Sequence, residues 1–317
     1  MVLDRKRRTI DHDRFLNFPG YLDRDEVLVL NETRVIPARL RGTKDGRDIE
    51  FLLVRKIGDG VWDALCRPAR RLKPGDTVSF AGGFQAEVTA AGLEGERSLR
   101  FTPRDTDRLM AETGFAPLPP YIKRGKDPAR WREEDLRRYQ TIFARHPGSI
   151  AAPTAGLHFT EDVFQDLRSR GVTIAALTLN VGQATFQPVR AEAIEDHRML
   201  EETYAVGAEA AGIINAAKQE SRPVTAVGTT SVRALESAAL AGDGRVLPGE
   251  RATGLFIRPG FEFQVVDKLL TNFHLPRSTL LMLVSALAGR ELIRDAYVLA
   301  VRERYRFFSY GDCMLIK

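Results

Sequence analysis

The chain has 317 residues, of which 44% are hydrophobic and only two are cysteine. This composition excludes a disordered chain and a disulfide-stabilised scaffold, and the length is enough for one large domain or two smaller ones. There are 47 Lys and Arg against 42 Asp and Glu, and the net charge of +5 is a mild basic bias that suits a polyanionic partner bound through one patch.

No apolar run in the sequence is long enough to cross a membrane, which takes roughly 20 residues. Residues 1–8 are basic, but no apolar segment follows them, which argues against a secretory signal. Cys66 and Cys313 form no CxxC motif, and the five histidines are scattered without the spacing of metal ligands. We therefore expect a cytoplasmic protein that attaches to no membrane and binds no metal.

The first third of the chain predicts a small antiparallel β domain. After a short apolar strand over 27–30, the stretch from about residue 39 to 103 alternates apolar and polar residues between Asp-Gly, Pro-Gly-Asp and Gly-Gly turns. Short strands at such regular spacing are typical of a barrel or a sandwich. We predict strands over 49–54, 61–66, 77–80, 84–88 and 98–101, followed by a helix over 105–113.

The rest of the chain predicts an α/β domain. Residues 117–122 are expected to be a stiff connector, because adjacent prolines fit neither a helix nor a central strand. From about residue 149 strands and helices alternate, which indicates a partly parallel sheet with helices on both faces. We predict helices over 160–170, 209–220, 231–241, 276–288 and 291–302, and strands over 172–179, 224–227, 255–257 and 263–266.

These patterns predict a discontinuous α/β catalytic domain over 1–38 and 122–317. An all-β domain over 39–121, which ends in the proline-rich connector, interrupts it.

Two segments combine glycine with small polar residues just before a predicted helix. Residues 151–160 place Gly156 and His158 before a helix start, where free backbone N–H groups suit a carboxylate or phosphate. Residues 226–236 place Gly228 before Thr229-Thr230-Ser231 and add the charge of Arg233. This second segment is neither a Walker A loop nor a GxGxxG motif. The alternatives are an ordinary loop, with His158 bonded to a carbonyl, and an ordinary Thr/Ser helix cap.

Two further segments carry polar groups beside apolar ones. Asn272, His274, Arg277 and Ser278 precede a strongly apolar helix, and four polar groups together favour a functional site over a core histidine. Residues 302–312 interleave arginines with aromatic residues, a composition that suits RNA through stacking and phosphate pairing. The alternative is that Phe307 and Phe308 fix the C-terminus to the core.

Seven runs of the sequence together resemble the S-adenosylmethionine:tRNA ribosyltransferase-isomerases of the queuosine pathway. They are residues 30–39, 117–122, 138–141, 151–160, 228–233, 269–285 and 305–312. The resemblance spans nearly the whole chain. It implies an α/β fold with an open-barrel-like mixed sheet and flanking helices, interrupted by an inserted small antiparallel β-barrel.

The resemblance also implies a reaction. The ribosyl part of S-adenosylmethionine is moved onto the aminomethyl group of a 7-deazaguanine at the tRNA wobble position, and adenine and methionine leave. S-adenosylmethionine is then a consumed substrate, and no cofactor is expected. The implied partners are S-adenosylmethionine and the anticodon stem-loop of tRNA, with the chain acting as a monomer.

We assign roles to the matched positions on this basis. His158 and His274 are the candidate acid/base groups, because imidazole exchanges protons near neutral pH. The candidates for binding substrate are Thr154, Gly156, Thr229, Thr230, Ser231, Arg233, Asn272, Arg277 and Ser278. The candidates for binding RNA are Arg34, Arg138, Tyr139, Arg304 and Arg306.

The sequence departs from the family pattern in two places. The family continues ahead of the stretch matching residues 1–4 with a segment that includes Arg-Asp-x-Ser-Arg. Asn180 and Ala184 stand where the family has His and Gly, and asparagine cannot act as an acid or base. One alternative is therefore a non-catalytic or altered-substrate tRNA-binding relative. A separate alternative is an ordinary S-adenosylmethionine methyltransferase, against which the missing Gly-rich cofactor loop argues.

Overall fold

The computed structural model describes residues 1–124, 129–182, 197 and 199–317, which form two compact units. The sheet unit comprises residues 1–34, 141–146 and 152–317, and the barrel unit comprises residues 35–140 and 147–151. The chain passes from one unit to the other within β4 (Thr33–Val35), between residues 140 and 141, and again within and just after β11 (His146–Ser149). These two strands form a small sheet of their own.

The sheet unit is built on a nine-stranded mixed sheet with a parallel centre. Strand β3 (Val27–Asn31) pairs in parallel with β12 (Thr173–Leu179) and β14 (Val224–Val227), and β14 pairs in parallel with β16 (Lys268–Asn272). All five residues of β3 are buried, as expected of a strand covered on both faces. The order is β15-β13-β12-β3-β14-β16-β17-β1-β2, with β1 (Val2–Asp4), β2 (Thr9–Asp11), β13 (Glu202–Val206), β15 (Gly249–Thr253) and β17 (Cys313–Ile316).

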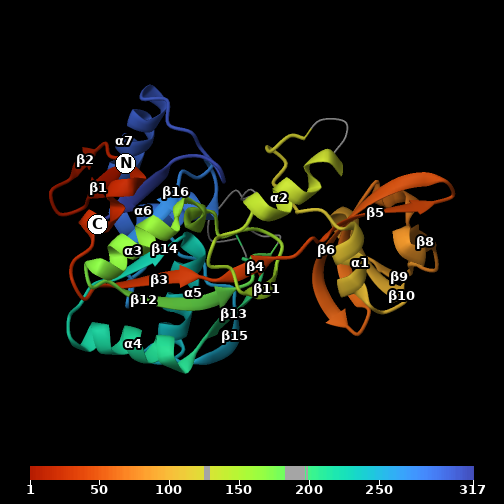
Figure 1. The fold of residues 1–317 in the computed structure, drawn as a ribbon, viewed down its shortest axis with the longest axis horizontal. Helices are drawn as coiled ribbons and strands as arrows, with labels where there is room; N and C mark the ends of the chain where they lie inside the picture. Colours follow the sequence, from red (N-terminus) through yellow and green to blue (C-terminus); the bar gives the residue numbers. More distant parts are fainter. Residues whose placement is uncertain (125–128, 183–196, 198) are drawn as a thin grey trace. The chain divides into compact units, whose positions relative to one another are not determined.

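Helices cover both faces of this sheet (Figure 1). Leu28 and Leu30 of β3 share an apolar cluster with residues of α3 (Glu161–Ser169) and the 3-10 helix η1 (Phe15–Tyr21). Helices α4 (Ala208–Gln219) and α5 (Thr229–Leu240) contact β3, β12 and β14, and Figure 1 shows α4 on the side of the sheet opposite α3. Helix α6 (Thr279–Ala288) packs on α7 (Arg290–Arg302).

Side-chain caps and one glycine set the limits of these helices. The Thr160 hydroxyl accepts from the Val163 N–H at 3.4 Å to start α3, and the Ser278 hydroxyl accepts from the Leu281 N–H at 3.2 Å to start α6. Gly289, with φ of 84°, separates α6 from α7 in a conformation that only glycine adopts readily.

The barrel unit contains a closed six-stranded barrel in the order β10-β7-β6-β5-β8-β9, with every pairing antiparallel. Alternate residues point inward, so Phe51 and Leu53 of β6 and Leu99 and Phe101 of β10 are at most 1% exposed. The strands are β5 (Arg39–Lys44), β6 (Arg47–Gly58), β7 (Val61–Arg67), β8 (Thr77–Phe80), β9 (Gln85–Ala91) and β10 (Glu96–Thr102). The helices are α1 (Thr106–Thr113) and α2 (Arg132–Arg138), with short 3-10 turns at η2 (Ala69–Arg71), η3 (Ala81–Gly83), η4 (Leu93–Gly95) and η5 (Ala129–Trp131).

Gly42 allows the barrel to close. A Cβ at this position of β5 would lie 2.7 Å from Val78 Cγ1 and 2.9 Å from the Phe80 ring, both on the neighbouring strand β8. These distances are shorter than van der Waals contact, so a larger residue would push β8 away.

The structure confirms the predicted α/β fold with a large mixed sheet and an antiparallel β-barrel. The strands predicted over 255–257 and 263–266 are wrong. The N–H groups of Val265 and Val266 bond to the buried carboxylate of Glu236 at 3.1 and 2.9 Å and so do not enter a ladder. The sheet strands lie on either side, at β15 and β16.

The division into units differs from the predicted boundary at residues 121 and 122. Arg132 of α2 donates to the carbonyl oxygens of Gly114 at 2.8 Å and Ala111 at 2.6 Å. These bonds join the stretch up to residue 140 to the barrel unit, whereas the sequence prediction placed it in the α/β domain.

Among the described residues, the structure contains no helix of the length and apolarity needed to span a bilayer.

Candidate active site

The carboxyl ends of the parallel strands gather polar residues from three of the four segments singled out in the sequence. In open α/β sheets this edge is where ligands bind. Strand β16 ends at Asn272, whose Oδ1 accepts from the Thr154 hydroxyl at 3.0 Å. Strand β14 is followed by Gly228 and the start of α5, and a Cβ at Gly228 would lie 3.8 Å from Ala155. The 151–160, 226–236 and 270–279 segments therefore meet at one edge.

Asn31 ties the strand ends at this edge together. Its Oδ1 accepts from the N–H groups of Leu179 at 3.0 Å and Thr33 at 3.2 Å. Its Nδ2 donates to the Leu179 carbonyl at 3.0 Å and to the Thr230 hydroxyl at 3.2 Å. Asn31 is 1% exposed, so this fully bonded amide fixes β3, β12 and α5 relative to one another.

Asn180 bridges two threonines beside Asn31. Its Oδ1 accepts from the Thr33 hydroxyl at 2.9 Å, and its Nδ2 donates to the Thr203 hydroxyl at 3.3 Å. Asn180 therefore joins Thr33 to Thr203 at this edge of the sheet. Ala184 lies outside the described residues.

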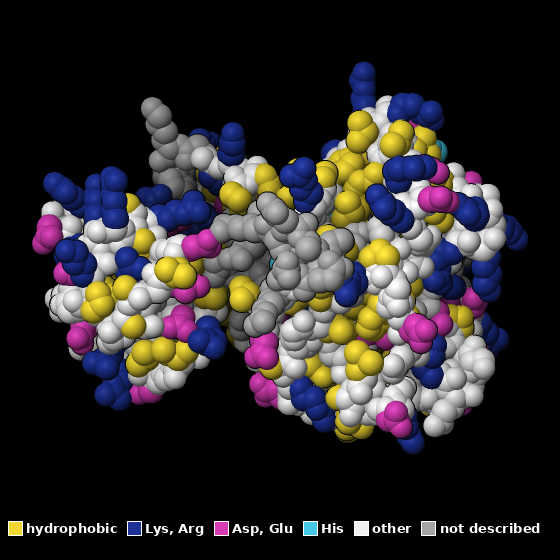
Figure 2. Space-filling model, turned by 180° about the vertical axis from the view of Figure 1, so that it is seen from behind, with side chains coloured by type: hydrophobic (Ala, Val, Ile, Leu, Met, Phe, Trp, Pro, Cys, Tyr) yellow, Lys and Arg dark blue, Asp and Glu magenta, His cyan; other side chains and the backbone are white. Residues whose placement is uncertain are grey.

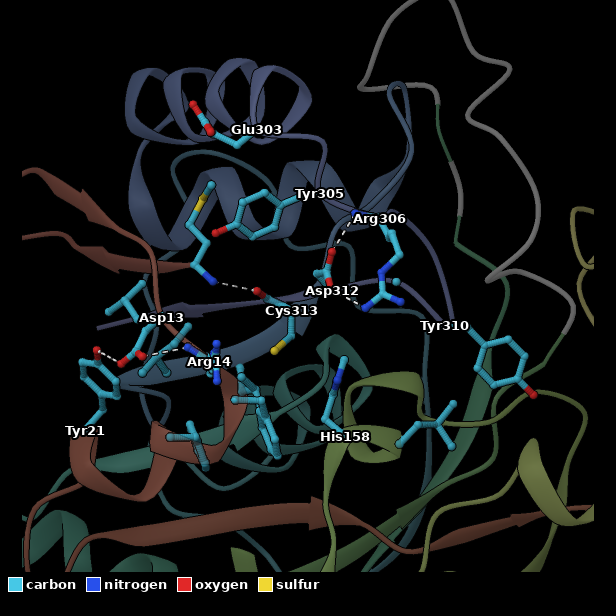
Figure 3. Close-up of a pocket in the computed structure, with 18 of the residues that line it drawn as sticks. Asp13, Arg14, Tyr21, His158, Glu303, Tyr305, Arg306, Tyr310, Asp312 and Cys313 are labelled. Atoms are coloured by element: carbon cyan, nitrogen blue, oxygen red, sulfur yellow. Dashed lines mark hydrogen bonds and ion pairs between the residues drawn. The ribbon is translucent and has the colours of Figure 1, made fainter.

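A cavity of about 590 Å³ lies in the sheet unit (Figure 3). Its wall carries three carboxylates, three guanidinium groups and several aromatic rings, which suits a ligand with charges of both signs and a flat apolar surface. The charged residues are Asp13, Glu303, Asp312, Arg14, Arg304 and Arg306, and the aromatic ones are Phe15, Phe18, Tyr21, Tyr305 and Tyr310, with His158 among them.

His158 lines this cavity in one defined tautomer. The Phe308 carbonyl accepts a hydrogen bond from Asn272 at 3.3 Å, and a carbonyl can only accept, so the group facing it is the amide Nδ2. The same Nδ2 lies 3.2 Å from His158 Nε2, which must then be the acceptor. The proton of the neutral ring is therefore on Nδ1. Burial lowers the pKa of His158, Asp312 opposes this shift and Arg306 adds to it.

The loop 305–312 supplies the opposite wall of the cavity. Asp312 accepts from the Arg306 N–H at 2.7 Å and from its guanidinium at 2.8 Å. Burial opposes ionisation of Asp312, but these bonds and the charge of Arg306 prevail and hold its pKa below the usual value. Gly311 is required here, because a Cβ would lie 2.3 Å from the Arg306 carbonyl oxygen.

Asp13 and Tyr21 form a second polar pair in the cavity wall (Figure 3). Asp13 accepts from the Tyr21 hydroxyl at 2.5 Å and from the Asn17 amide at 2.6 Å. The hydrogen bond to Asp13 raises the pKa of Tyr21 to about 12 and lowers that of Asp13. Asp13 therefore presents a carboxylate to the cavity at neutral pH.

His274 is not among the described residues that line this cavity. Its Nε2 lies 2.8 Å from the Thr271 hydroxyl, and its backbone N–H donates to the Tyr297 hydroxyl at 2.8 Å. Burial lowers the pKa of His274 to about 4, so its ring is neutral at pH 7. Its predicted role as an acid or base gains no support from this position.

Arg233 is likewise not among the described cavity residues. Its guanidinium pairs with Glu202 of β13 and donates to the carbonyl oxygens of Leu255 at 3.1 Å and Thr253 at 3.4 Å. Both charged side chains are at most 5% exposed. Glu202 also accepts from the Gly182 N–H at 2.8 Å, so the pair holds the end of β12 beside the start of β13.

Comparisons with known proteins show the family of the chain. A family model described as "Queuosine biosynthesis protein" matches residues 1–316. The chain belongs to this family. Two similar proteins are both named S-adenosylmethionine:tRNA ribosyltransferase-isomerase. The one from Acetivibrio thermocellus is 48% identical, with 100% of this chain and 92% of that protein covered. The one from Rhodospirillum rubrum is 51% identical, with 95% and 86% covered.

A solved structure of the same kind is also similar. The crystal structure of S-adenosylmethionine tRNA ribosyltransferase from Thermotoga maritima has a TM-score of 0.53 and 37% sequence identity to this chain. The likeness covers 100% of this chain and 91% of that one.

Several residues matched to the queuosine biosynthesis family hold the fold at this edge. Ser278 caps α6 and also donates to the Leu275 carbonyl at 2.7 Å, and Ser231 donates to the Val227 carbonyl at 2.7 Å. A Cβ at Gly156 would lie 2.7 Å from the Phe143 ring, so glycine is needed for packing. Thr229 is buried, and Arg277 is exposed with φ of 59°. Their substrate roles stay predictions.

The residues predicted to bind RNA fall into three groups. Arg304 and Arg306 line the cavity, and Arg34 is exposed. Arg138 is exposed on α2 and pairs with Glu134 at 2.9 Å. Tyr139 is only 1% exposed, so its ring offers no face for stacking on a base in this conformation, and its RNA contact stays a prediction.

Sequence reasoning missed the carboxylates of the site. Asp312 and Asp13 were not selected, although Asp312 ends a run matched to the queuosine biosynthesis family and Asp13 follows the charged pair Asp11-His12. Asn31 was also missed, although it lies in the matched 30–39 run. Within the described part of the chain, no three His, Cys, Asp or Glu side chains gather so that they could hold a metal ion.

Proposed function

We propose that this chain is an S-adenosylmethionine:tRNA ribosyltransferase-isomerase. It transfers and isomerises the ribosyl group of S-adenosylmethionine onto 7-aminomethyl-7-deazaguanine at the wobble position of tRNA. The products are epoxyqueuosine-tRNA, adenine and methionine. The observation that carries this proposal is the match, over nearly the whole of both chains, to relatives of this name at 47–51% identity.

The reaction sets clear demands on the site. The aminomethyl nitrogen of the tRNA base loses a proton and bonds to the ribosyl group, while the bonds from that group to adenine and to the methionine sulfur break. The isomerisation joins the carbons of the ribosyl group by a new carbon–carbon bond into the epoxide-bearing cyclopentane ring. A base must first remove a proton from the carbon next to the sulfonium, whose positive charge stabilises the resulting carbanion. The protein must also hold a sulfonium, a carboxylate and an extruded nucleobase.

The cavity beside β16 supports this proposal because its groups match those demands. The Tyr305 and Phe15 rings and the Asp312 carboxylate suit the sulfonium. Arg304 is exposed in the cavity wall, has no ion pair among the described residues, and suits the methionine carboxylate. His158, with its proton on Nδ1, acts as a hydrogen-bond donor to a substrate oxygen in this arrangement.

The tRNA substrate adds an expected location and mode of binding. We expect the enzyme to work in the cytoplasm as a monomer and to recognise the anticodon stem-loop. A base in a single-stranded loop is easier to extrude than one in a duplex.

The test is product analysis. The protein is incubated with S-adenosylmethionine and tRNA that carries 7-aminomethyl-7-deazaguanine, and the small molecules and the nucleoside mass are followed. The proposal predicts adenine and methionine in equal amounts and conversion of the base to epoxyqueuosine. Release of S-adenosylhomocysteine would instead show a methyltransferase, and salt-sensitive tRNA binding without adenine release would show a non-catalytic relative.

A further inference from the structure

A second cavity, of about 300 Å³, lies wholly within the barrel unit. It is bounded by β5, the start of β6, the segment 115–124 and helix α2. Its polar lining consists of Arg39, Arg41, Arg124, Arg132, Glu50 and Asp135. Four guanidinium groups face two carboxylates, so the lining carries a net charge of 4 − 2 = +2.

Three of these arginines are held in place by hydrogen bonds, and only one of the three is neutralised by a direct hydrogen bond to a carboxylate. Arg39 donates to the Leu118 carbonyl at 3.0 Å, and Arg132 donates to the neutral carbonyls of Gly114 and Ala111. Arg124 pairs with the buried Asp135, which uses up that carboxylate. Such guanidinium groups are ordered before a ligand arrives, so little side-chain entropy is lost on binding.

Two donors remain for an anion. The Nε of Arg39 is buried and makes no hydrogen bond within the described structure, and the nearest carboxylate oxygen, on Glu50, is 3.8 Å away. Arg41 is exposed, lies over the Phe115 ring at 5.7 Å, and has no ion pair with any described residue. Arg39 Nε thus has a long ion pair with Glu50 but no hydrogen bond, and a buried donor without a hydrogen bond is costly, which indicates room for an acceptor at this point.

We propose that this cavity binds a phosphate of the tRNA backbone together with its ribose. Guanidinium groups match phosphate oxygens in pairs, and Phe115 and Leu118 supply an apolar surface for the sugar. A volume of 300 Å³ equals that of roughly ten liquid waters and exceeds what one phosphate group needs. The proposal rests on the proposed function and gives strand β5 and the segment 115–124 a role in RNA binding that the sequence did not assign.

Figure 2 shows positive charge on the surface of the barrel unit. Lys and Arg side chains gather along the upper edge of the barrel unit, on the left in that view. This charge attracts a polyanion at long range, whereas the cavity would fix one phosphate.

The experiment compares two arginine variants that remove the same charge from the same barrel. Arg41→Gln removes the guanidinium at the cavity, and Arg47→Gln removes an exposed one outside it. The dissociation constant for tRNA is measured without S-adenosylmethionine at several salt concentrations. We expect Arg41→Gln to weaken binding about 3- to 10-fold and to reduce the slope of log K against log salt by about 0.7–0.9, the value for one lost phosphate contact.

Arg47→Gln should leave the slope unchanged, and Arg41→Lys should keep the slope while losing part of the affinity, because lysine keeps the charge without the two-pronged geometry. Equal effects of Arg41→Gln and Arg47→Gln would overturn the proposal, since only general charge would then matter. The result is separate from the proposed function: adenine release by the wild type tests the reaction, and this binding assay tests the cavity.

Discussion

One amide decides which nitrogen of His158 can act. Because the Phe308 carbonyl fixes the Asn272 amide, His158 Nε2 is an acceptor and Nδ1 carries the proton. This residue-scale feature is accessible to measurement without a substrate. It also limits the chemistry, since a base needs a free lone pair and the Nε2 lone pair is in use.

We predict that ¹⁵N-labelled histidine in the wild type reports a protonated Nδ1 and an unprotonated Nε2 for His158 at pH 7.5. Asn272→Asp should move the proton to Nε2 and raise the pKa of His158 by about one unit or more, because a carboxylate would then accept from the ring. Thr154→Ser keeps the hydroxyl that bonds to Asn272 and should leave the tautomer as it is. A wild type with the proton on Nε2 contradicts the assignment.

His274 gives the fold a defined sensitivity to acid. Its folded pKa of about 4 is below the usual value of 6.5, so between these values the unfolded chain takes up a proton that the folded chain does not. Stability contributed by the neutral ring is therefore present above pH 6.5 and is lost as the pH falls toward 4.

The free energy of unfolding of the wild type should fall between pH 7 and pH 5 because of this proton. In His274→Gln, which can keep the bond to Thr271, that fall should be about 1–2 kcal/mol smaller. Urea unfolding at the two pH values measures the difference. His12→Gln, at an exposed histidine, is the control and should retain the wild-type loss. Parallel behaviour of wild type and His274→Gln across this range would show that the ring is not enclosed.

At the scale of elements, the buried pair of Arg233 and Glu202 links α5 to β13. Removing one partner of a buried pair leaves an uncompensated charge, whereas replacing both by apolar residues is tolerated. The pair therefore holds α5 against the antiparallel half of the sheet.

Glu202→Gln should lower the free energy of unfolding by about 3–5 kcal/mol. The double variant Glu202→Leu with Arg233→Met should lose less than the sum of the two single changes, because no charge remains buried. Chemical denaturation of the wild type, Glu202→Leu, Arg233→Met and the double variant closes the cycle, and Glu202→Gln is measured beside them. If Glu202→Gln were as stable as the wild type, the ion pair would not hold this edge, and Arg233 would be free to bind substrate as the sequence predicts.

The elements with strong local patterns could be predicted from the sequence. The four residues Val224–Val227 and the strand Thr77–Phe80 match the predicted limits, and α7 is within one residue. Short strands from the chain ends could not be predicted: β1 and β17 lie side by side in the sheet, Val2 opposite Leu315, and their other neighbours are β2 and β16. Glu236 shows the converse, because a buried carboxylate that takes up backbone N–H groups prevents an apolar run from forming a strand.

The site was predictable only in part for the same reason. The 151–160, 226–236 and 270–279 segments meet because parallel strands end at one edge, which the alternating pattern already indicated. The bonding of Arg233 depends on Glu202, which precedes it by 31 positions and lies in a strand that was not predicted. Burial of Tyr139 is equally a tertiary property, invisible in the run that contains it.

At the scale of the whole molecule, the position of the barrel unit in the chain has a consequence for folding during synthesis. Strand β3 emerges from the ribosome before the barrel residues, but its neighbours β12 and β14 follow them. The barrel strands pair only with one another, so the barrel can close as soon as its own residues are synthesised. Strand β3 has no sheet neighbour until β12 and β14 are synthesised. If translation pauses after the barrel, the nascent chain therefore exposes the apolar residues of an incomplete sheet, which chaperones and proteases recognise.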